Sequence, residues 1–319
     1  MSWTTRKPYR LVAEMKLIFA GTPANSAQAL RQLAAEHEVS LVITREDAPV
    51  GRSRSLQESE VAKTARELGL SVLKANRIAP DHLSLISSAG AALAVVVAYG
   101  ALIPKAALEI LPWWNLHFSL LPKWRGATPL QHSIMHEGDG AGVTVFKLDS
   151  GLDTGEIVAQ EEVELLDNED TLSALPRFTD IGMNLLLKAL VDNPTPTPQV
   201  GLPSPAPKIM REAARLDFQT TANQVAAKIQ ALNPEPMAWC DLNGQTLRII
   251  EATSLGSANW IQLGDRQPKL GEVWLDQKQV RVSCSNGTVL VLKTVQPAGK
   301  KQMSASDWYR GLNGKVILD

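Results

Sequence analysis

The sequence Lys16-Leu-Ile-Phe-Ala20 is a short apolar run that ends in Gly21-Thr-Pro23. Residues 26–36 follow it with apolar side chains on one helical face, and residues 39–44 form a second apolar run. A buried strand, a helix and another buried strand in this order are typical of a parallel sheet with crossover helices. This stretch therefore predicts an α/β fold.

The same alternation of strands and helices continues outward to about residue 190. The most apolar run is Leu93 to Ala98, and residues 114–117 form a further strand-like run with polar residues at its end. Open α/β sheets bind their ligands beyond the carboxyl ends of the strands. We therefore expect a Rossmann-like, mostly parallel sheet with its functional residues at or just after residues 114–117.

The sequence changes character at Pro194 to Pro207, which holds six of the 19 prolines. This density is typical of a stiff, extended connector. Beyond it lie one helical stretch, 222–232, and short strand-like runs between 246 and 294, a spacing that predicts a small OB-like β-barrel. The chain thus has four predicted parts. They are an N-terminal extension (1–14), a first domain (15–193), a linker (194–214) and a C-terminal β-barrel domain (215–319).

Composition excludes several classes of protein. With 319 residues, 45% hydrophobic and 20% charged, the chain is a globular protein of about two domains. Its net charge of −1 excludes binding of nucleic acid over the whole surface but leaves a local basic face open. Cys240 and Cys284 lack metal-ligand spacing, and no apolar run approaches the ~20 residues of a membrane span. We expect a soluble cytoplasmic protein that contacts no membrane.

Familiar nucleotide motifs are missing from the sequence. Gly21-Thr-Pro23 is not followed by Gly-x-Gly-x-x-Gly, and there is no P-loop. The chemistry therefore has to come from other residues. On a strand, Asn115 and His117 point to the same side. Asp153 lies between two glycines in a turn-forming segment. The residues alone leave open whether these side chains are functional, or a strand cap, a core histidine and a solvated turn aspartate.

Three segments taken together resemble the 10-formyltetrahydrofolate-dependent formyltransferase family: Asn115-Leu-His117, Ser119-Leu-Leu-Pro122 and Gly151-Leu-Asp-Thr-Gly155. Within that family, Arg125-Gly-Ala-Thr-Pro129 and the segment from Val295 to Met303 are similar to members whose acceptor is methionyl initiator tRNA. The resemblance implies that 15–193 is a catalytic, folate-binding formyltransferase domain and that the barrel domain binds tRNA. It also implies a role in translation initiation.

The resemblance implies three catalytic residues and no metal. Amine attack on a formyl carbon creates an oxyanion and a charged nitrogen, so the site must donate hydrogen bonds and remove a proton. Asn115 would donate to the oxyanion, while His117 would donate to the same oxygen or relay a proton to the departing folate nitrogen. Asp153 would orient the imidazole. The co-substrate would be 10-formyltetrahydrofolate, and we expect a monomer.

The resemblance also implies binding residues for both substrates. Folate would lie along a loop and beside a neighbouring strand end: Ser119, Leu120, Leu121, Pro122, Val97, Tyr99 and Gly100. The phosphates of tRNA would contact basic residues in a loop of the first domain and in the barrel domain: Arg52, Arg54, Lys300 and Lys301. A plain turn for the first set and solvated surface charge for the second are the alternatives.

Two other functions fit parts of this pattern. The same folate chemistry could serve a different amine, either a glycinamide ribonucleotide or an amino-sugar nucleotide. A noncatalytic folate-binding or RNA-binding module could also keep the architecture. The C-terminal domain opposes the first alternative, and the joint presence of Asn115, His117 and Asp153 opposes the second. One departure from the family pattern is Ala24-Asn-Ser26, where Glu-Phe-Ala is usual.

Overall fold

The computed structural model describes residues 14–50, 54–255, 268–312 and 316–319. It divides into two compact units, each built from separate stretches of the chain. Unit 1 comprises Met1–Pro122, Val143–Glu161 and Phe178–Leu202. Unit 2 comprises Lys123–Gly142, Glu162–Arg177 and Pro203–Asp319. The units alternate along the sequence, whereas the predicted four-part division is linear and stays a prediction.

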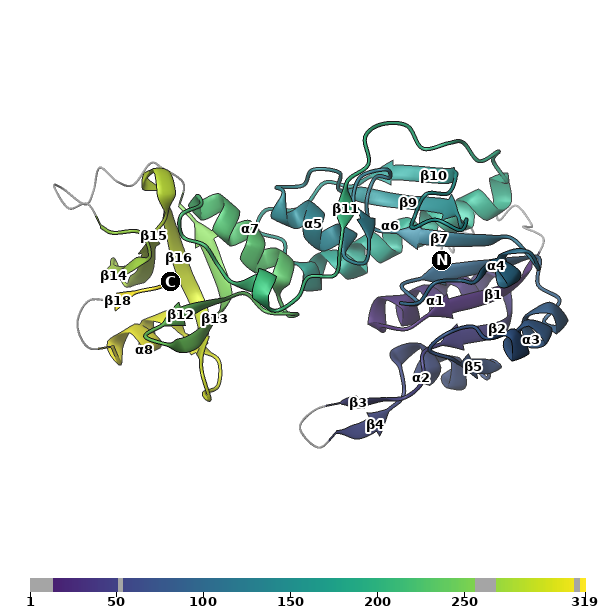
Figure 1. Cartoon of the computed structure of the whole chain (residues 1–319), viewed down its shortest axis with the longest axis horizontal. Coiled ribbons are helices and arrows are strands. Elements are labelled where there is room, and N and C mark those ends of the chain that lie inside the picture. Colours follow the sequence, from purple (N-terminus) through teal and green to yellow (C-terminus); the bar gives the residue numbers. More distant parts are fainter. Residues whose placement is uncertain (1–13, 51–53, 256–267, 313–315) are drawn as a thin grey trace, which may run out of the picture. The chain divides into compact units, whose positions relative to one another are not determined.

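Unit 1 is built on a seven-stranded sheet in the order β10-β9-β7-β6-β1-β2-β5 (Figure 1). Five strands run parallel: β1 (Lys16–Gly21), β2 (Glu38–Thr44), β5 (Val72–Lys74), β6 (Leu93–Val97) and β7 (Trp113–His117). Beyond them, β9 (Gly142–Lys147) pairs antiparallel with β7, and β10 (Ile157–Glu162) forms the edge. The predicted Rossmann-like, mostly parallel sheet is confirmed.

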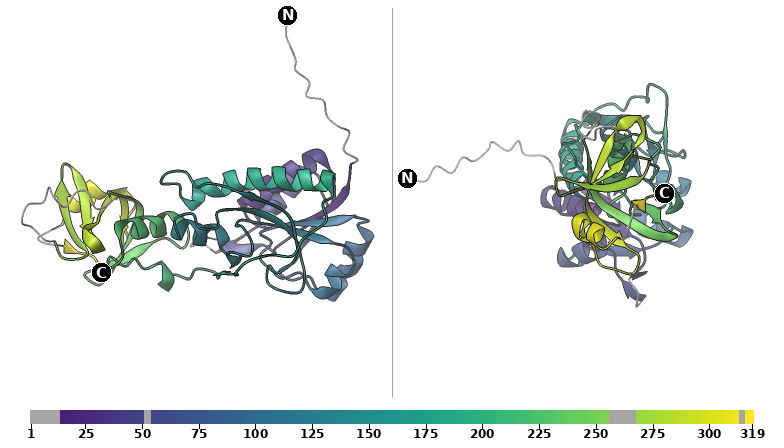
Figure 2. Two further views of the ribbon diagram at one scale, coloured as in Figure 1. Left: turned by 90° about the horizontal axis from the view of Figure 1, so that it is seen from above. Right: turned by 90° about the vertical axis from the view of Figure 1, so that its left-hand side faces the viewer.

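Helices cover both faces of this sheet. On one face, α1 (Ala24–Glu36) lies beside α6 (Thr171–Asp192), as Figure 2 shows, and Gln32 Nε2 donates to Asp180 Oδ1 at 2.5 Å. Gly182 lets α6 approach β7 closely, because a Cβ there would lie 2.6 Å from a methyl carbon of Leu116. On the other face, α3 (Leu83–Ser88) and α4 (Lys105–Leu108) contribute Ile86 and Ala107 to a buried cluster. Burying apolar surface from both faces stabilises the sheet.

Two smaller elements of unit 1 lie outside this core. Helix α2 (Glu60–Glu67) is capped by Ser59, whose side chain accepts a hydrogen bond from the Ala62 N–H. Before it, β3 (Ala48–Val50) and β4 (Ser55–Gln57) form a hairpin that extends away from the sheet (Figure 1). The sequence predicts a basic loop here, because no apolar alternation marks the two short strands.

The C-terminal part of unit 2 is an antiparallel barrel-like sheet in the order β12-β13-β16-β15-β14-β18. Its strands are β12 (Trp239–Leu242), β13 (Gln245–Ser254), β14 (Glu272–Asp276), β15 (Gln279–Ser283), β16 (Val289–Pro297) and β18 (Val316–Ile317). Backbone hydrogen bonds between Asp241 and Asp319, at 2.5 and 3.0 Å, join its first strand to the residues after its last strand. The predicted small barrel is confirmed. Helix α8 (Ala305–Arg310), which follows β17 (Met303–Ser304), was not predicted.

Helical elements of unit 2 precede the barrel in sequence. Helix α7 (Ala222–Leu232) begins at a capping box made by Thr221 and Gln224. Capping satisfies backbone N–H groups at the first turn that have no partner within the helix. Helix α7 contacts α5 (Pro129–Met135), and Thr171 Oγ1 donates to Ala231 O at 2.8 Å.

The proline-rich segment is held at both ends by backbone pairing. Near its start, Ile157 and Thr197 exchange backbone hydrogen bonds of 2.8 and 2.9 Å within unit 1. Near its end, β11 (Pro205–Ala206) pairs in parallel with β8 (Arg125–Gly126) within unit 2. The residues between the prolines supply hydrogen bonds, and the role of the segment as a stiff connector stays a prediction. Among the described residues, no helix is long and apolar enough to cross a membrane.

Candidate active site

Strand β7 carries two of the candidate catalytic residues. Asn115 lies opposite Phe146 and His117 opposite Thr144 in the ladder with β9. Because side chains alternate along a strand, Asn115 and His117 share one face. The Asn115 side chain is half-buried, and no other residue in the described part of the chain forms a hydrogen bond with its carboxamide. His117 is 4% exposed, and its ring meets the Phe146 ring edge-on at 6.1 Å.

The loop after β9 brings Asp153 to the imidazole. Asp153 Oδ2 lies 4.0 Å from His117 Nδ1, and the two side chains are 13% and 5% exposed. Within the loop, the Asp149 carboxylate accepts hydrogen bonds from Gly151 N at 3.0 Å and from Thr154 Oγ1 at 2.7 Å. Asp153 itself adopts a left-handed backbone with φ of +52°. The structure therefore brings together Asn115, His117 and Asp153, which the sequence separates by up to 38 positions.

Two residues that the sequence analysis did not single out hold the segment from Ser119 to Pro122. Thr144 Oγ1 donates to Ser119 O at 2.6 Å and accepts from Leu121 N at 3.2 Å. Gln160 Nε2 donates to Leu121 O at 3.0 Å and to Thr144 Oγ1 at 2.8 Å. The only signal in the sequence was that Thr144 is a polar residue within the apolar strand β9.

Leu120 is the one side chain of this four-residue loop that is not buried. Ser119, Leu121 and Pro122 are buried, and Leu120 is half-buried. The Leu121–Pro122 peptide bond is cis. A ligand that lies along this loop would therefore meet mainly Leu120 and backbone groups. The role of Ser119, Leu120, Leu121 and Pro122 in folate binding remains a prediction.

The neighbouring end of β6 is also fixed by side chains. Ser26 Oγ donates to Val97 O at 2.6 Å, and Thr22 Oγ1 donates to Tyr99 O at 2.9 Å. The Tyr99 ring is 1% exposed, and its hydroxyl donates to Ala75 O at 2.6 Å. At this position only the backbone of Tyr99 could therefore face a ligand.

The carbonyl group of Gly100 is likewise engaged, because Arg45 Nη1 donates to it at 2.6 Å. A carbonyl oxygen has two acceptor lone pairs, so an oxygen that accepts one of these hydrogen bonds can accept a second. Folate binding by Val97, Tyr99 and Gly100 stays a prediction.

The candidate tRNA-binding residues that the structure describes are exposed and belong to separate units. Arg54 is exposed in unit 1 beside the β3–β4 hairpin, and Arg52 lies outside the described residues. Lys300 and Lys301 are exposed in unit 2, in the turn between β16 and β17. Exposed cations on turns are suited to phosphate contact, and all four assignments remain predictions.

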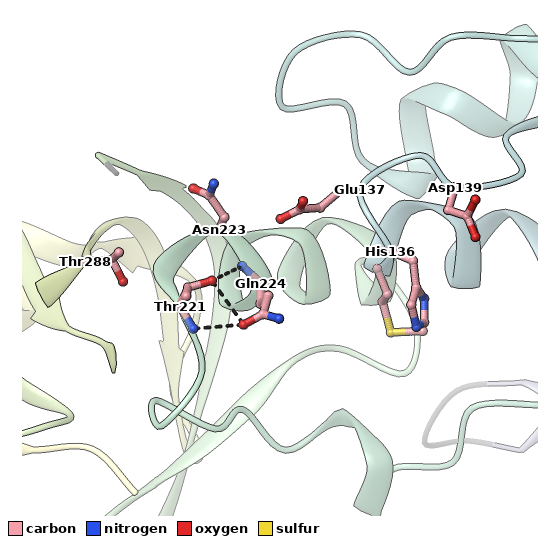
Figure 3. Close-up of a pocket in the computed structure, with 8 residues that line it drawn as sticks. His136, Glu137, Asp139, Thr221, Asn223, Gln224 and Thr288 are labelled. Carbon is pink, nitrogen blue, oxygen red and sulfur yellow. Dashed lines mark hydrogen bonds between the residues drawn. The ribbon is translucent and has the colours of Figure 1, made fainter. Parts of the chain in front are cut away.

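Two further features of the described part of the chain concern ligand binding. It holds no group of three or more His, Cys, Asp and Glu side chains that could bind a metal ion. Unit 2 has an open pocket lined by residues at the end of α5 and the start of α7, including His136, Glu137, Asn223 and Gln224 (Figure 3). The pocket in Figure 3 has no lining residue in common with the Asn115–His117–Asp153 site.

Comparison with known proteins identifies the family. Residues 15–190 match the formyl transferase family, and residues 208–313 match the formyl transferase C-terminal domain. A methionyl-tRNA formyltransferase from Leifsonia xyli subsp. xyli is 40% identical over 312 residues, which cover 95% of this chain and 100% of that protein. Another from Paenarthrobacter aurescens is 41% identical and covers 93% of this chain and 97% of that protein.

Solved structures share the fold at lower sequence identity. HypX from Aquifex aeolicus in complex with tetrahydrofolic acid has a TM-score of 0.62 at 18% identity, covering 93% of this chain. This chain spans about half of HypX, 47% of its length. Methionyl-tRNA formyltransferase from Clostridium thermocellum has a TM-score of 0.53 at 19% identity, covering 75% of this chain and 93% of that one. The sequence matches and the shared fold together show that the chain belongs to the formyl transferase family.

Proposed function

We propose that this protein transfers the formyl group of 10-formyltetrahydrofolate to the α-amino group of methionyl initiator tRNA. Relatives named methionyl-tRNA formyltransferase are about 40% identical over nearly the whole chain, which supports this acceptor. The observation that carries the proposal is that Asp153 Oδ2 lies 4.0 Å from His117 Nδ1. His117 shares strand β7 with Asn115. An amide donor, an imidazole and a carboxylate can together supply the oxyanion stabilisation and the proton transfer that acyl transfer to an amine requires.

The reaction forms one carbon–nitrogen bond and breaks another. The amine of the methionyl ester attacks the formyl carbon, and the carbonyl oxygen becomes an oxyanion. Asn115 donates its NH₂ to this oxygen, where a fixed donor stabilises the charge that develops. The amine loses a proton, the bond from the formyl carbon to the folate nitrogen breaks, and that nitrogen gains a proton. His117 relays the proton, and Asp153 orients the imidazole and stabilises its charged form.

Folate enters this proposal as a substrate that the chain binds and releases. A solved structure with the same fold contains tetrahydrofolic acid, which supports a folate of this class. The chain offers the loop from Ser119 to Pro122, which Thr144 and Gln160 hold in place, and the backbone near Gly100. A loop whose conformation is already fixed loses little entropy when a ligand binds.

A different amine acceptor is disfavoured. The N-formyltransferase from Helicobacter canadensis, solved with folinic acid and dTDP-3-aminofucose, has a TM-score of 0.61 at 18% identity, so the likeness concerns the fold alone. The 40% identical relatives are named for methionyl-tRNA. The monomeric state and the cytoplasmic location predicted from the sequence stay predictions.

The proposal is tested by mixing purified protein with 10-formyltetrahydrofolate and methionine-charged tRNA. One arm uses initiator tRNA, a second uses elongator tRNA, and a third replaces tRNA with a dTDP-amino sugar. We expect formyl-methionine, detected by mass spectrometry after ester hydrolysis, mainly from the initiator arm. No product in that arm would overturn the proposal, and equal use of both tRNAs would remove the selectivity. His117→Ala serves as the inactive control, with its fold checked by circular dichroism.

A further inference from the structure

The proline-rich segment forms hydrogen bonds with the loop that carries Asp153 and with the start of β10. Ile157 and Thr197 form an antiparallel bridge. In antiparallel pairing, moving two residues back on one strand corresponds to moving two residues forward on the other. This register places Gln199 opposite Gly155, immediately after Asp153 and Thr154.

At this position a side chain replaces backbone pairing. Gln199 Nε2 donates to Gly155 O at 2.8 Å and to Asp153 O at 2.9 Å. Gln199 is half-buried, whereas its neighbours Pro198 and Val200 are exposed. One carboxamide therefore holds two carbonyl groups on either side of Thr154, and its side chain points inward between two exposed neighbours.

The opposite side of this loop leaves little room for it to shift. A Cβ on Gly155 would lie 1.7 Å from Lys147 O, so the loop backbone packs directly against the end of β9. Lys147 N also donates to Glu156 O at 2.9 Å. With β9 on one side and Gln199 on the other, the backbone that carries the Asp153 carboxylate is fixed from both directions.

We infer that Gln199 is a positioning residue for the formyl transfer reaction, acting by holding Asp153 at its working distance from His117. The inference rests on the proposed function, because it assumes that the pairing of Asp153 with His117 serves catalysis. Displacing a catalytic group by about 1 Å can cost on the order of 10²-fold in rate. If Gln199 acts only through Asp153, substituting Gln199 should not change the rate once the Asp153 carboxylate has been removed.

The experiment compares Gln199→Met, Asp153→Asn and the double variant in the full-length protein. Gln199→Met keeps the length of the side chain and removes both donors. We expect kcat to fall roughly 10-fold to 100-fold, with KM for both substrates within about twofold. In the Asp153→Asn background the same change should lower kcat by less than about twofold. Gln32→Met, which removes a hydrogen bond to Asp180 on the surface of the same unit, is the matched control and should retain normal kcat.

A second measurement keeps the inference separate from the proposed function. NMR resonances of the His117 ring, assigned by their loss in His117→Gln, report the position of Asp153 without any turnover. In Gln199→Met they should move toward their positions in Asp153→Asn. Unchanged resonances, or an equal loss of kcat in both backgrounds, would overturn the role of Gln199. A wild-type protein that fails to formylate tRNA while the resonances move as expected would instead count against the proposed function alone.

Discussion

Thr144 lies directly opposite His117 in the β7–β9 ladder, and its hydroxyl donates to the backbone carbonyl of Ser119 at 2.6 Å. The same oxygen accepts from the N–H of Leu121 at 3.2 Å. One fully buried hydroxyl on β9, the strand that pairs with β7, therefore holds the loop that follows His117. Thr144 therefore links the backbone beside His117, the proposed catalytic imidazole, to the shape of the proposed folate loop.

We expect Thr144→Val to weaken both the fold and folate binding. Valine keeps the volume of threonine but leaves the groups of Ser119 and Leu121 without this buried partner, which costs about 1–3 kcal/mol of unfolding free energy. KM for 10-formyltetrahydrofolate should rise several-fold, because the loop becomes less ordered. Urea unfolding and steady-state kinetics measure the two effects. Thr144→Ser keeps the hydroxyl and should stay near wild type in KM; a similar rise in both variants would contradict the explanation.

For Asn115→Ala we expect a loss confined to the chemical step. The half-buried side chain has no partner among the described residues, so removing it should leave the unfolding free energy nearly unchanged. The loss of one oxyanion donor costs on the order of 10²-fold to 10³-fold in kcat. Single-turnover formylation with saturating substrates measures this step. A reduction below tenfold would show that another group stabilises the oxyanion.

Arg54→Ala should weaken tRNA binding without changing catalysis. Arg54 is exposed. Removing one phosphate contact should reduce the slope of log binding constant against log salt concentration by about one. We expect KM for tRNA to rise while kcat is unchanged. Arg31→Ala is the matched control, because Arg31 pairs with Glu67 on the surface of unit 1. An unchanged salt slope in Arg54→Ala would assign this residue to ordinary surface charge.

Acidification should destabilise the protein partly through His132. Burial lowers the pKa of His132 below its usual value of 6.5 and the nearby His136 lowers it further, against a hydrogen bond to the Pro207 backbone that raises it. Burial also lowers the pKa of His37. A histidine with a lowered folded pKa binds more protons when unfolded, so stability falls as pH drops through about 6.5 toward the folded value.

The measurement is urea unfolding at pH 7.5 and pH 5.5. The wild type should lose stability between these two values, and His132→Gln should lose less. His132 stacks on Trp124 with ring centroids 5.5 Å apart, so the variant should also be less stable at pH 7.5. If the pH-dependent loss were as large in His132→Gln as in the wild type, the effect would belong to other groups.

The strands and helices with a clear apolar periodicity could be predicted from the sequence alone. The runs that became β1, β2 and β6 are almost continuously apolar because both faces of a parallel sheet are covered. Asn115 and His117 could be placed on one face because side chains alternate along a strand. The resemblance to a family then paired them with Asp153, and the structure brings that residue to His117.

Other features depend on tertiary contacts that local patterns do not encode. Folate binding by Tyr99 stays a prediction, and the sequence did not show that its side chain turns into the core, where its hydroxyl donates to Ala75 O. Thr144 and Gln160 act through hydrogen bonds to a loop that is distant in sequence. Gln199 lies in a segment whose prolines suggested only a connector, and its partners come from 44 and 46 positions earlier.

The pairing of β8 with β11 has a practical consequence for anyone who wishes to dissect this protein. Ser204 O and Ala206 O accept hydrogen bonds from Arg125 N at 2.8 Å and Thr128 N at 3.2 Å. A gene fragment that stops near residue 193 would leave these two N–H groups without their acceptors. Chimeras that exchange barrels between relatives should therefore be joined after Pro207, so that β8 and β11 come from the same protein.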